Sequence, residues 1–324
     1  METTHHDILI IGAGMAGLSC ARHLADAGLA PVLIDKGRGP GGRMASRRVT
    51  IAGADISFDH GAQYFTARDP AFRAAVAAWE EAGAAAPWPD AGDEAFVGTP
   101  GMNGPLKTMA QGFDVRWGVR ATQLAKEGMG WRVTTDAGEI AARCVVVAVP
   151  AEQARDLLAA AAPELAVLPA AVTSAPCWAV LVAFAEPLPL TDACLRRDGP
   201  ISWAARNAAK PQRAPLETWV IHASPARSRE VLDMPRDAVA ALLLEDFRTA
   251  AGLACLPELV HCDAHRWLYA LPGVAAGEPA RFDAAAGIGI AGDYLHSPRV
   301  EGAWLSGRKL ADAILHERAA PQAC

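Results

Sequence analysis

Short apolar runs bounded by glycine alternate with amphipathic stretches at the start of the chain. Residues 7–11 form a run of branched apolar residues followed by glycine, which predicts a buried strand. Residues 15–27 carry apolar positions at helical spacing and precede Gly28, a residue type that commonly ends a helix. A second apolar run covers 32–35, so the opening of the chain predicts a β-α-β unit.

The pattern after this unit changes twice along the chain. In the middle we expect a helix over 70–86 capped by Asp69, a loop over 87–105, strands within 113–135, a strand at 144–149 and a helix over 151–162. Beyond residue 170 we expect strands at 178–184, 217–222 and 259–270, and a helix over 235–250 that begins at Pro235. The first pattern then returns, with a strand at 288–291 and a helix over 299–317.

These patterns predict an α/β protein with two domains. A Rossmann-type nucleotide-binding domain takes both ends of the chain and is expected to comprise 1–66, 106–165 and 280–324. A second domain, based on a β-sheet and expected to bind substrate, comprises 67–105 and 166–279. The 324 residues, 52% of them hydrophobic, are enough for two cores of ordinary size.

Composition and charge limit which binding partners and which cellular location are expected. The net charge is −6 and basic residues are not clustered, so nucleic acid and anionic membrane are not expected partners. No apolar stretch is long enough for a membrane span, and the N-terminus lacks the features of a signal peptide. The seven cysteines are scattered without C-x-x-C spacing, which favours a reducing, cytoplasmic setting without disulfides or zinc. Whether the protein is a monomer or a dimer stays open.

The strongest candidate site is a glycine motif between the first strand and the first helix. It runs Gly12, Ala13, Gly14, Met15, Ala16, Gly17 and matches G-x-G-x-x-G. The first glycine permits a tight turn, the second lets a pyrophosphate approach the backbone, and the third allows the helix to pack on the strand. Asp35 ends the next strand and is the expected acceptor for an adenosine ribose.

A second glycine motif at 287–292 has the same spacing but a different setting. Its glycines lie within an expected strand, and Asp293 and Tyr294 follow instead of a helix. We therefore expect a single dinucleotide cradle, so that the electron donor reaches the cofactor through the other domain.

Two further segments indicate FAD rather than NAD as the bound dinucleotide. Gly41, Gly42 and Arg43 form a second glycine-rich loop, which suits a longer cofactor whose phosphates or flavin the guanidinium could reach. Near the C-terminus, Asp293 could accept from the ribityl chain, and the amides of Gly302 and Ala303 could face the flavin from a helix N-terminus. The expected cofactor residues of these segments are Lys36, Gly41, Gly42, Arg43, Met44, Gly292, Asp293, Val300, Glu301, Gly302 and Ala303.

Together with Asp59-His60-Gly61-Ala62-Gln63-Tyr64-Phe65, these motifs resemble the flavin-containing amine oxidase superfamily, and 61–64 resembles its renalase branch. The resemblance implies an amine oxidase or p-hydroxybenzoate hydroxylase-like topology and non-covalent FAD. It implies that His60, Gly61, Ala62, Gln63 and Tyr64 line the flavin, with Gln63 and Tyr64 positioning substrate. The implied reaction oxidises 2- or 6-dihydro isomers of NAD(P)H to NAD(P)+ by hydride transfer to flavin N5, and O2 becomes H2O2.

The second domain offers aromatic side chains as candidate walls for a nicotinamide ring. We expect Trp203, Trp219, His222 and Trp267 to contact substrate. The arginines at 196, 197, 206 and 213 lie on proline-rich loops and are expected to be solvated. None of the five lysines falls in a segment expected above the flavin, and we assign neither an acid–base residue nor a metal site.

Two alternative functions remain open at this point. The first is a flavin amine oxidase or desaturase acting on another small substrate. The second is a non-catalytic binding protein on the same fold, against which the intact glycine motifs and Asp35 argue.

Overall fold

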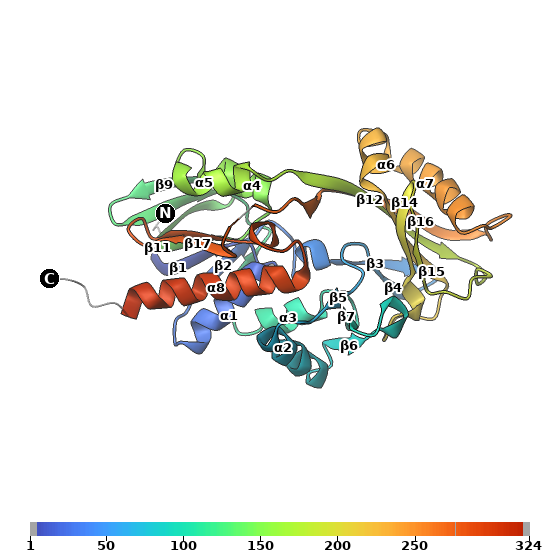
Figure 1. The fold of residues 1–324 in the computed structure, drawn as a ribbon, viewed down its shortest axis with the longest axis horizontal. Coiled ribbons are helices and arrows are strands. Elements are labelled where there is room, and N and C mark those ends of the chain that lie inside the picture. Colours follow the sequence, from blue (N-terminus) through green and yellow to red (C-terminus); the bar gives the residue numbers. More distant parts are fainter. Residues whose placement is uncertain (1–4, 276, 320–324) are drawn as a thin grey trace.

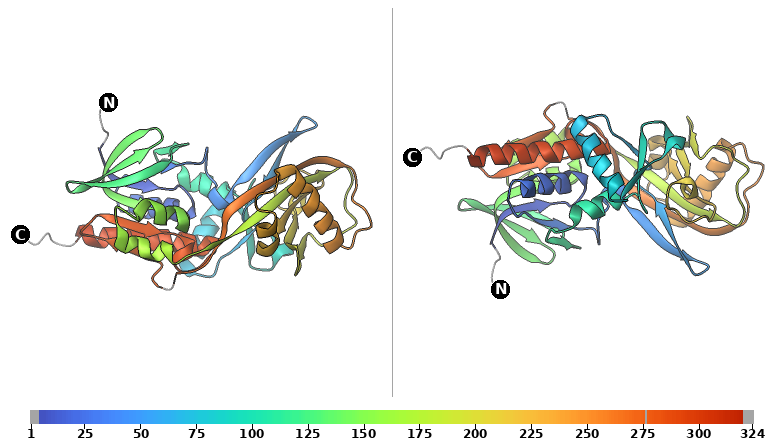
Figure 2. Two further views of the ribbon diagram at one scale, coloured as in Figure 1. Left: turned by 90° about the horizontal axis from the view of Figure 1, so that it is seen from above. Right: turned by 90° about the horizontal axis from the view of Figure 1, so that it is seen from below.

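The computed structural model describes residues 5–275 and 277–319. Two lobes lie at opposite ends of an elongated molecule (Figure 1). We call them the first lobe, built on the sheet that contains β1, and the second lobe, built on the sheet that contains β12. A hairpin of β3 (Ser46–Ile51) and β4 (Ala54–Asp59) extends from the first lobe alongside the second (Figure 2).

The first sheet has a parallel centre, as the opening β-α-β pattern predicts. Its main strand order is β17-β18-β11-β1-β2-β8, with β10 and β9 continuing from β11. Its strands are β1 (His5–Ile11), β2 (Val32–Asp35), β8 (Val115–Trp117), β9 (Ala121–Glu127), β10 (Gly130–Thr135), β11 (Gly138–Val147), β17 (Ala280–Asp283) and β18 (Ile288–Ala291). The strand order reverses beside β1, and this crevice is where open α/β sheets bind ligands.

Helices from opposite ends of the chain cover one face of this sheet. α1 (Met15–Asp26) and α8 (Val300–Ala319) run side by side (Figures 1 and 2). A Cβ at Gly307 would lie 2.0 Å from the Ala16 carbonyl oxygen, so a larger residue could not keep this close approach. The other face carries α4 (Ala151–Leu158) and α5 (Pro163–Ala170).

The segment between the hairpin and β8 contains more regular structure than the sequence predicts. α2 (Pro70–Glu81) begins as expected, with the Asp69 carboxylate accepting from the amides of Ala71 and Phe72. It stops before residue 86, because Gly83 turns the chain with φ +68°. The expected loop over 87–105 is also wrong, since β6 (Ala85–Pro87) and β7 (Ala95–Gly98) pair with β5 (Phe65–Thr66), and α3 (Gly104–Ala110) follows.

The second sheet is antiparallel and confirms the predicted strands after residue 170. Its order is β13-β14-β15-β12-β16, with β13 (Cys194–Arg196), β14 (Ile201–Arg206), β15 (Thr218–Ala223), β12 (Ser174–Phe184) and β16 (Leu259–Pro272). α6 (Pro225–Glu230) and α7 (Arg236–Ala250) lie over one face of it (Figure 1). Pro235 is the cap of α7 rather than its first residue.

Strand alternation gives this sheet one apolar face and one mixed face. Trp178, Trp219 and Ile221 pack with Val239 and Phe247 of α7 in a buried apolar cluster. The opposite face points toward the hairpin and the chain around residue 60. The two-domain boundaries predicted above remain a prediction, although the two sheets belong to separate lobes.

Two chemical properties of the described residues complete the picture. The six cysteines among them are free thiols, and the seventh, Cys324, lies outside the described residues. No helix within 5–275 and 277–319 is both long enough and apolar enough to cross a membrane.

Candidate active site

The first glycine loop has the geometry that a dinucleotide pyrophosphate requires. A Cβ at Gly12, which has φ +104°, would lie 2.3 Å from the Ala148 carbonyl oxygen, so the turn leaves no space there. A Cβ at Gly14 would meet no protein atom within 4 Å. Gly14 therefore faces open space at the N-terminus of α1, where free amides and the helix dipole attract phosphate.

Asp35 is held next to this loop by backbone amides. Its Oδ2 accepts from the Ala13 amide at 2.7 Å and its Oδ1 accepts from the Gly37 amide at 2.6 Å. Each carboxylate oxygen has a second lone pair, so Asp35 can still accept from a ribose hydroxyl. The neighbouring Lys36 instead donates to Gln153 Oε1 at 3.0 Å, and burial lowers the pKa of its ammonium.

Four segments that are far apart in sequence converge beside Gly14. A Cβ at Gly42 would lie 3.9 Å from Gly14 Cα, so the two glycine loops face each other. Arg43 donates to Asp293 Oδ1 at 2.5 Å, and the Ala62 amide donates to the Arg43 carbonyl at 2.8 Å. Open space at one glycine loop, flanked by a second loop and an arginine–aspartate pair, fits the shape and charge of FAD.

Several predicted cofactor residues have structural partners. Met15, Ala16 and Met44 are buried in the core, and Gly17 is packed against the Gly12 carbonyl. The Gly292 amide donates to Ser306 Oγ at 2.8 Å. The side chains of Met15, Ala16 and Met44 therefore belong to the core, and a role for these residues in holding the cofactor remains a prediction.

The start of α8 corrects part of the expected flavin contact. The Glu301 carboxylate accepts from the amides of Arg68 and Asp69, each at 2.7 Å, so this side chain fixes the turn before α2. The amide of Ala303 is not free, because it donates to the Arg299 carbonyl at 3.0 Å. Free amides at this helix end are those of its first turn, Val300 to Gly302, since the helix begins at Val300.

A fully buried carboxylate, Asp59, joins three segments at the interface of the lobes. Its Oδ1 accepts from Ser46 Oγ at 2.7 Å and from the Met102 amide at 2.8 Å. Its Oδ2 accepts from Lys210 Nζ at 3.2 Å and from Arg213 Nη2 at 2.6 Å. Burial alone would raise the pKa of Asp59, but Lys210 and Arg213 outweigh it and lower the pKa to about 2.

Lys210 also reaches Gln63, which corrects two predictions. Its Nζ donates to Gln63 Oε1 at 3.0 Å, so one lysine does lie beside the segment expected to line the flavin. The Gln63 Nε2 donates to the Asp59 and Gly61 carbonyls. The Gln63 amide is thus used within the protein and shapes the loop, instead of being offered to a nicotinamide. Burial lowers the pKa of Lys210, which Asp59 partly opposes.

The expectation of solvated arginines holds for two of the four. Arg196 and Arg197 are exposed. Arg213 is buried against Asp59, and Arg206 is half-buried against Glu217 at 3.1 Å and over the Trp219 ring. Burial of these two follows from the carboxylates that the fold brings to them.

An aromatic group lines the mixed face of the second sheet opposite 60–64. The Tyr64 and Trp203 rings lie 5.5 Å apart, and Arg196 lies over both and donates to the Tyr64 hydroxyl at 3.3 Å. Trp203 pairs with His222 across the strands, and His222 Nε2 is 3.5 Å from Gln63 Nε2. The fold therefore brings Tyr64, Trp203 and His222 together, and their contact with substrate remains a prediction.

Trp267 and Trp219 lie in different surroundings, and each is engaged by other residues of the protein. The Trp267 ring stacks on the His60 ring at a centroid distance of 5.1 Å, and its indole N–H donates to the His60 carbonyl at 2.8 Å. Trp267 therefore holds the start of the 60–64 loop in place. Trp219 is fully buried on the other face of the sheet and packs on Phe247. The prediction that Trp219 contacts substrate is wrong, because strand alternation turns it toward α7.

The histidines near this face are neutral at physiological pH. Burial lowers the pKa of His60 to about 3 and that of His222 to about 4. The pKa of His265, which meets the His60 ring edge-on at 4.8 Å, is lowered to about 4, mainly by burial and by the nearby Arg47. These rings add polarity without charge to the wall of the site.

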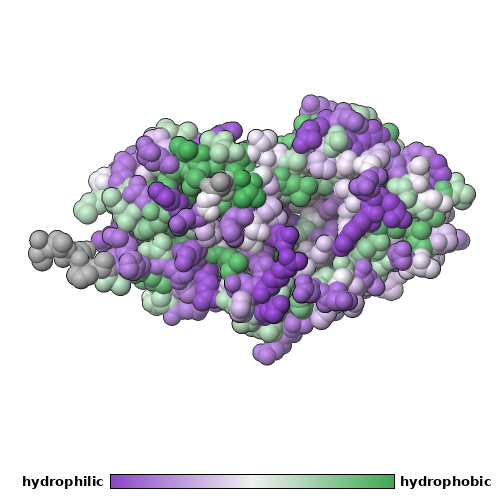
Figure 3. Space-filling view, viewed as in Figure 1, coloured by the Kyte–Doolittle hydropathy of each residue, from purple (hydrophilic) through white to green (hydrophobic). Residues whose placement is uncertain are grey.

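Asp59, Lys210 and Arg213 cannot be recognised as a group from the sequence alone. The available signal was weak: a carboxylate ends the strand before His60, and two basic residues share one short loop. In the space-filling view the surface is hollowed between the lobes, and hydrophilic residues border the hollow (Figure 3).

Two family models match the chain. Residues 10–79 match the NAD(P)-binding Rossmann-like domain, and residues 88–315 match the flavin containing amine oxidoreductase family. A curated relative, hydroxyneurosporene desaturase of Rubrivivax gelatinosus, is 44% identical over 79 residues. The aligned part is 24% of this chain and 14% of the desaturase.

Solved structures share the fold at low identity. A protein of an Exiguobacterium species assigned as a protoporphyrinogen oxidase superposes with a TM-score of 0.75 at 13% identity, covering 98% of this chain and all of that one. Putrescine oxidase gives 0.72 at 14% identity, covering 97% of this chain and 100% of that one. Cyclohexylamine oxidase from Brevibacterium oxydans gives 0.64 at 14% identity, with the same coverage.

The family match extends over more than half of the chain and includes the whole second lobe. It confirms FAD as the cofactor and an oxidoreductase as the class of protein, which argues against the non-catalytic alternative. The description of the family names amine oxidoreductases, so it supports the amine oxidase alternative more directly than oxidation of dihydronicotinamides. The chain belongs to the flavin containing amine oxidoreductase family.

Proposed function

We propose that the protein removes a hydride from a flat, uncharged or anionic small molecule, and that dihydronicotinamide isomers are its first candidate substrates. The observation that carries this proposal is the charge around Gln63. The single negative charge of Asp59 faces the two cations Lys210 and Arg213. Even with Lys210 neutral, this group keeps no negative charge to attract a protonated amine.

The aromatic wall supports the same class of donor. Tyr64 and Trp203 present flat rings, and Arg196 above them adds a positive charge at the exposed edge. Flat rings favour stacking of a planar heterocycle, and a guanidinium favours a phosphate or carboxylate attached to it. A dihydronicotinamide dinucleotide has both features.

Positioning is the main task left to the protein. FAD, when bound, accepts the hydride, and with one proton from solvent the two electrons reduce O2 to H2O2. A dihydronicotinamide releases hydride without loss of a proton, so the chain needs no general base at the reacting carbon. Gln63, held by Lys210, fixes the 61–64 loop, while neutral His222 and Trp203 form the facing wall.

A second candidate function is oxidation of an amine or desaturation of another small molecule. Lys210 favours it, because a buried lysine beside the flavin-lining loop can hold a proton or a water molecule near the reacting bond. The names of the relatives also point this way. A neutral amine or hydrocarbon would enter the site without a charge penalty.

Mixing FAD-loaded protein with each donor in the absence of O2 separates the two candidates. We expect rapid bleaching of the flavin band by 2- or 6-dihydro isomers of NAD(P)H, and slow or no bleaching by putrescine or cyclohexylamine. Bleaching by amines alone would overturn the first candidate in favour of the second. Bleaching by neither donor class would reject both substrate assignments.

Lys210→Met sharpens this test, with Lys309→Met as a control at an exposed lysine. If dihydronicotinamide is the donor, any slowing of flavin reduction by displacement of the Gln63 loop should be the same at every pH, because no proton leaves the reacting carbon. A loss of about 100-fold or more with an amine donor, restored in part at high pH, would instead give Lys210 an acid–base role.

The cofactor assignment has its own test. Gly14→Val should abolish FAD binding, because its side chain would enter the space next to α1 where the pyrophosphate is expected. The protein itself leaves that space open, so misfolding is not the expected cause of lost colour. Gly39→Val, also in open space, is the matched control and should keep its FAD. If the Gly14→Val protein is yellow and binds FAD at normal stoichiometry, the phosphate site must lie elsewhere.

A further inference from the structure

A polar pocket lies beside the β3–β4 hairpin, where Ser46 and Arg213, which both bond Asp59, form part of its lining. It has a volume of about 240 Å³ and is lined by the hairpin, by the turn that leads into α3 and by the loop after Lys210. None of the residues expected to hold FAD lines it. The pocket is therefore separate from the cofactor cradle.

The pocket carries an excess of positive charge. Arg48, Lys107 and Arg213 line it against a single carboxylate, Asp55, which accepts from Thr50 at 3.0 Å. Within 5–275 and 277–319, neither Arg48 nor Lys107 has a carboxylate partner within 4.0 Å. This concentration of cations contrasts with the net charge of −6 of the whole chain.

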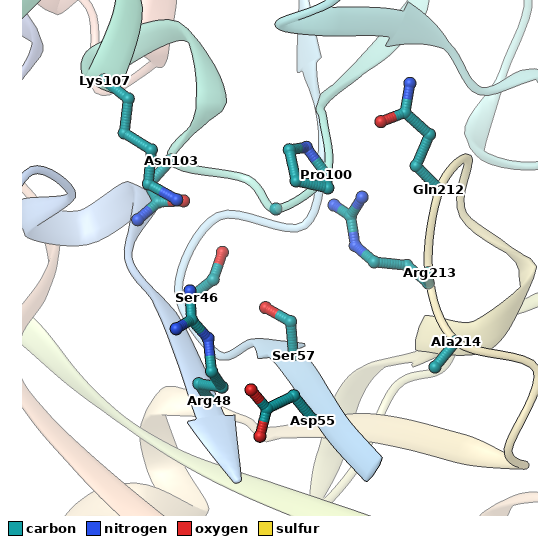
Figure 4. Close-up of a pocket in the computed structure, with 11 residues that line it drawn as sticks. Ser46, Arg48, Asp55, Ser57, Pro100, Asn103, Lys107, Gln212, Arg213 and Ala214 are labelled. Atoms are coloured by element: carbon teal, nitrogen blue, oxygen red, sulfur yellow. The ribbon is translucent and has the colours of Figure 1, made fainter. Parts of the chain in front are cut away.

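Donors that the fold does not use also point to an anion. Arg213 donates four hydrogen bonds, to Asp59, Gly98 and Pro211. A guanidinium has five N–H donors, so one N–H of Arg213 has no partner in the described part of the chain. The hydroxyls of Ser46 and Ser57 point into the pocket, and Arg213 lies on the wall opposite Arg48 (Figure 4). Ser46 already donates to Asp59, so Ser57 is the hydroxyl that remains available as a donor.

We propose that this pocket binds a small oxyanion with several charged oxygens, such as a phosphate or a short dicarboxylate. Three cations and a serine hydroxyl match such a group. The volume is below the roughly 300–1,000 Å³ of sites for drug-sized ligands, which favours a small anion over a nucleotide. Because Arg213 lines the pocket and also bonds Asp59, three side chains, Arg213, Asp59 and Lys210, connect the pocket to Gln63.

Calorimetric titration of the FAD-saturated protein at low ionic strength tests the proposal. The probes are inorganic phosphate, pyrophosphate and malonate, with sodium chloride at matched ionic strength as the reference. We expect saturable binding of at least one oxyanion; the phosphate and malonate arms separate phosphate-type from carboxylate-type ligands. The readout needs no turnover, so it is independent of the proposed hydride-transfer function.

A pair of double variants distinguishes a site from general charge attraction. Arg48→Ala with Lys107→Ala removes two exposed cations that have no ion pair, so folding should be unaffected, and the affinity should fall at least tenfold. Arg229→Ala with Lys309→Ala removes the same charge from exposed positions elsewhere and should leave the affinity unchanged. No saturable binding by the natural protein, or equal losses in the two double variants, would overturn the proposal.

Discussion

The two faces of the second sheet meet different surroundings although they share the same strands. In β15, Trp219 and Ile221 face α7 in a buried apolar cluster. His222 lies on the opposite face, where it is near Gln63 and is paired across the strands with Trp203. One face contributes buried apolar area, and the other meets neutral histidines and the carboxylate of Asp59 with its two cations. The comparison teaches that position parity in a strand, rather than residue type, separates a core tryptophan from a site tryptophan.

The largest effect is expected when the buried charge cluster next to the polar face loses its carboxylate. Asp59→Asn leaves Lys210 and Arg213 without their carboxylate, and removal of one partner from a buried ion pair costs about 3–5 kcal/mol. We expect a loss of that size in the free energy of unfolding measured with urea. Asp55→Asn, on the same hairpin and exposed, should cost less than about 0.5 kcal/mol. Equal effects of the two changes would contradict the role of Asp59.

The apolar face should respond through stability alone. Trp219→Ala removes a fully buried ring and should lower the free energy of unfolding by about 3 kcal/mol or more. The folded fraction should keep its flavin reduction rate and its affinity for the donor. A changed donor affinity together with an unchanged free energy of unfolding would contradict the assignment of Trp219 to the apolar face.

Acid offers a third test, because it charges the histidines of the polar face. The pKa of His60 is about 3 in the folded protein and 6.5 in the unfolded chain, so between these values the unfolded chain binds more protons. Stability is therefore complete above pH 6.5 and falls on acidification, by about 1.4 kcal/mol per pH unit for a fully buried histidine. His60→Gln should reduce the dependence of the urea midpoint on pH between 6.5 and 4.5 by the share of one histidine, while His222 and His265 keep theirs. A slope identical to that of the natural protein would show that His60 does not titrate on unfolding.

The smallest effect is expected at the rim of the site. Arg196 is exposed, so Arg196→Ala should change the free energy of unfolding by less than about 0.5 kcal/mol. We expect a KM for a phosphate-bearing donor raised about tenfold, from loss of roughly 1.4 kcal/mol, and little change in kcat. Arg197→Ala is the matched control, and an unchanged KM would remove Arg196 from substrate recognition.

The cradle could be predicted from sequence because its signals are local. Gly12 to Gly17 and Asp35 belong to one β-α-β unit, so spacing alone places them at the same crevice. The polar group around Asp59 depends on a contact with Lys210 across 151 positions, which no periodicity reports. Residue type alone makes Trp219 a candidate for substrate contact, because the sequence does not show the strand register that turns it toward α7. The alanine-rich sequence likewise predicts a helix that is too long, because it does not reveal the turn at Gly83.

The docking of α8 against α1 and of β18 beside β11 has a consequence for synthesis of the chain. β1, α1, β2 and β11 are synthesised well before β18 and α8, the strand and helix that complete their sheet and cover them. At about 5–20 residues per second, these apolar surfaces wait on the order of ten seconds for their final neighbours. A nascent or prematurely terminated chain therefore exposes the cradle unfinished, and we expect it to depend on chaperones more than the completed protein does.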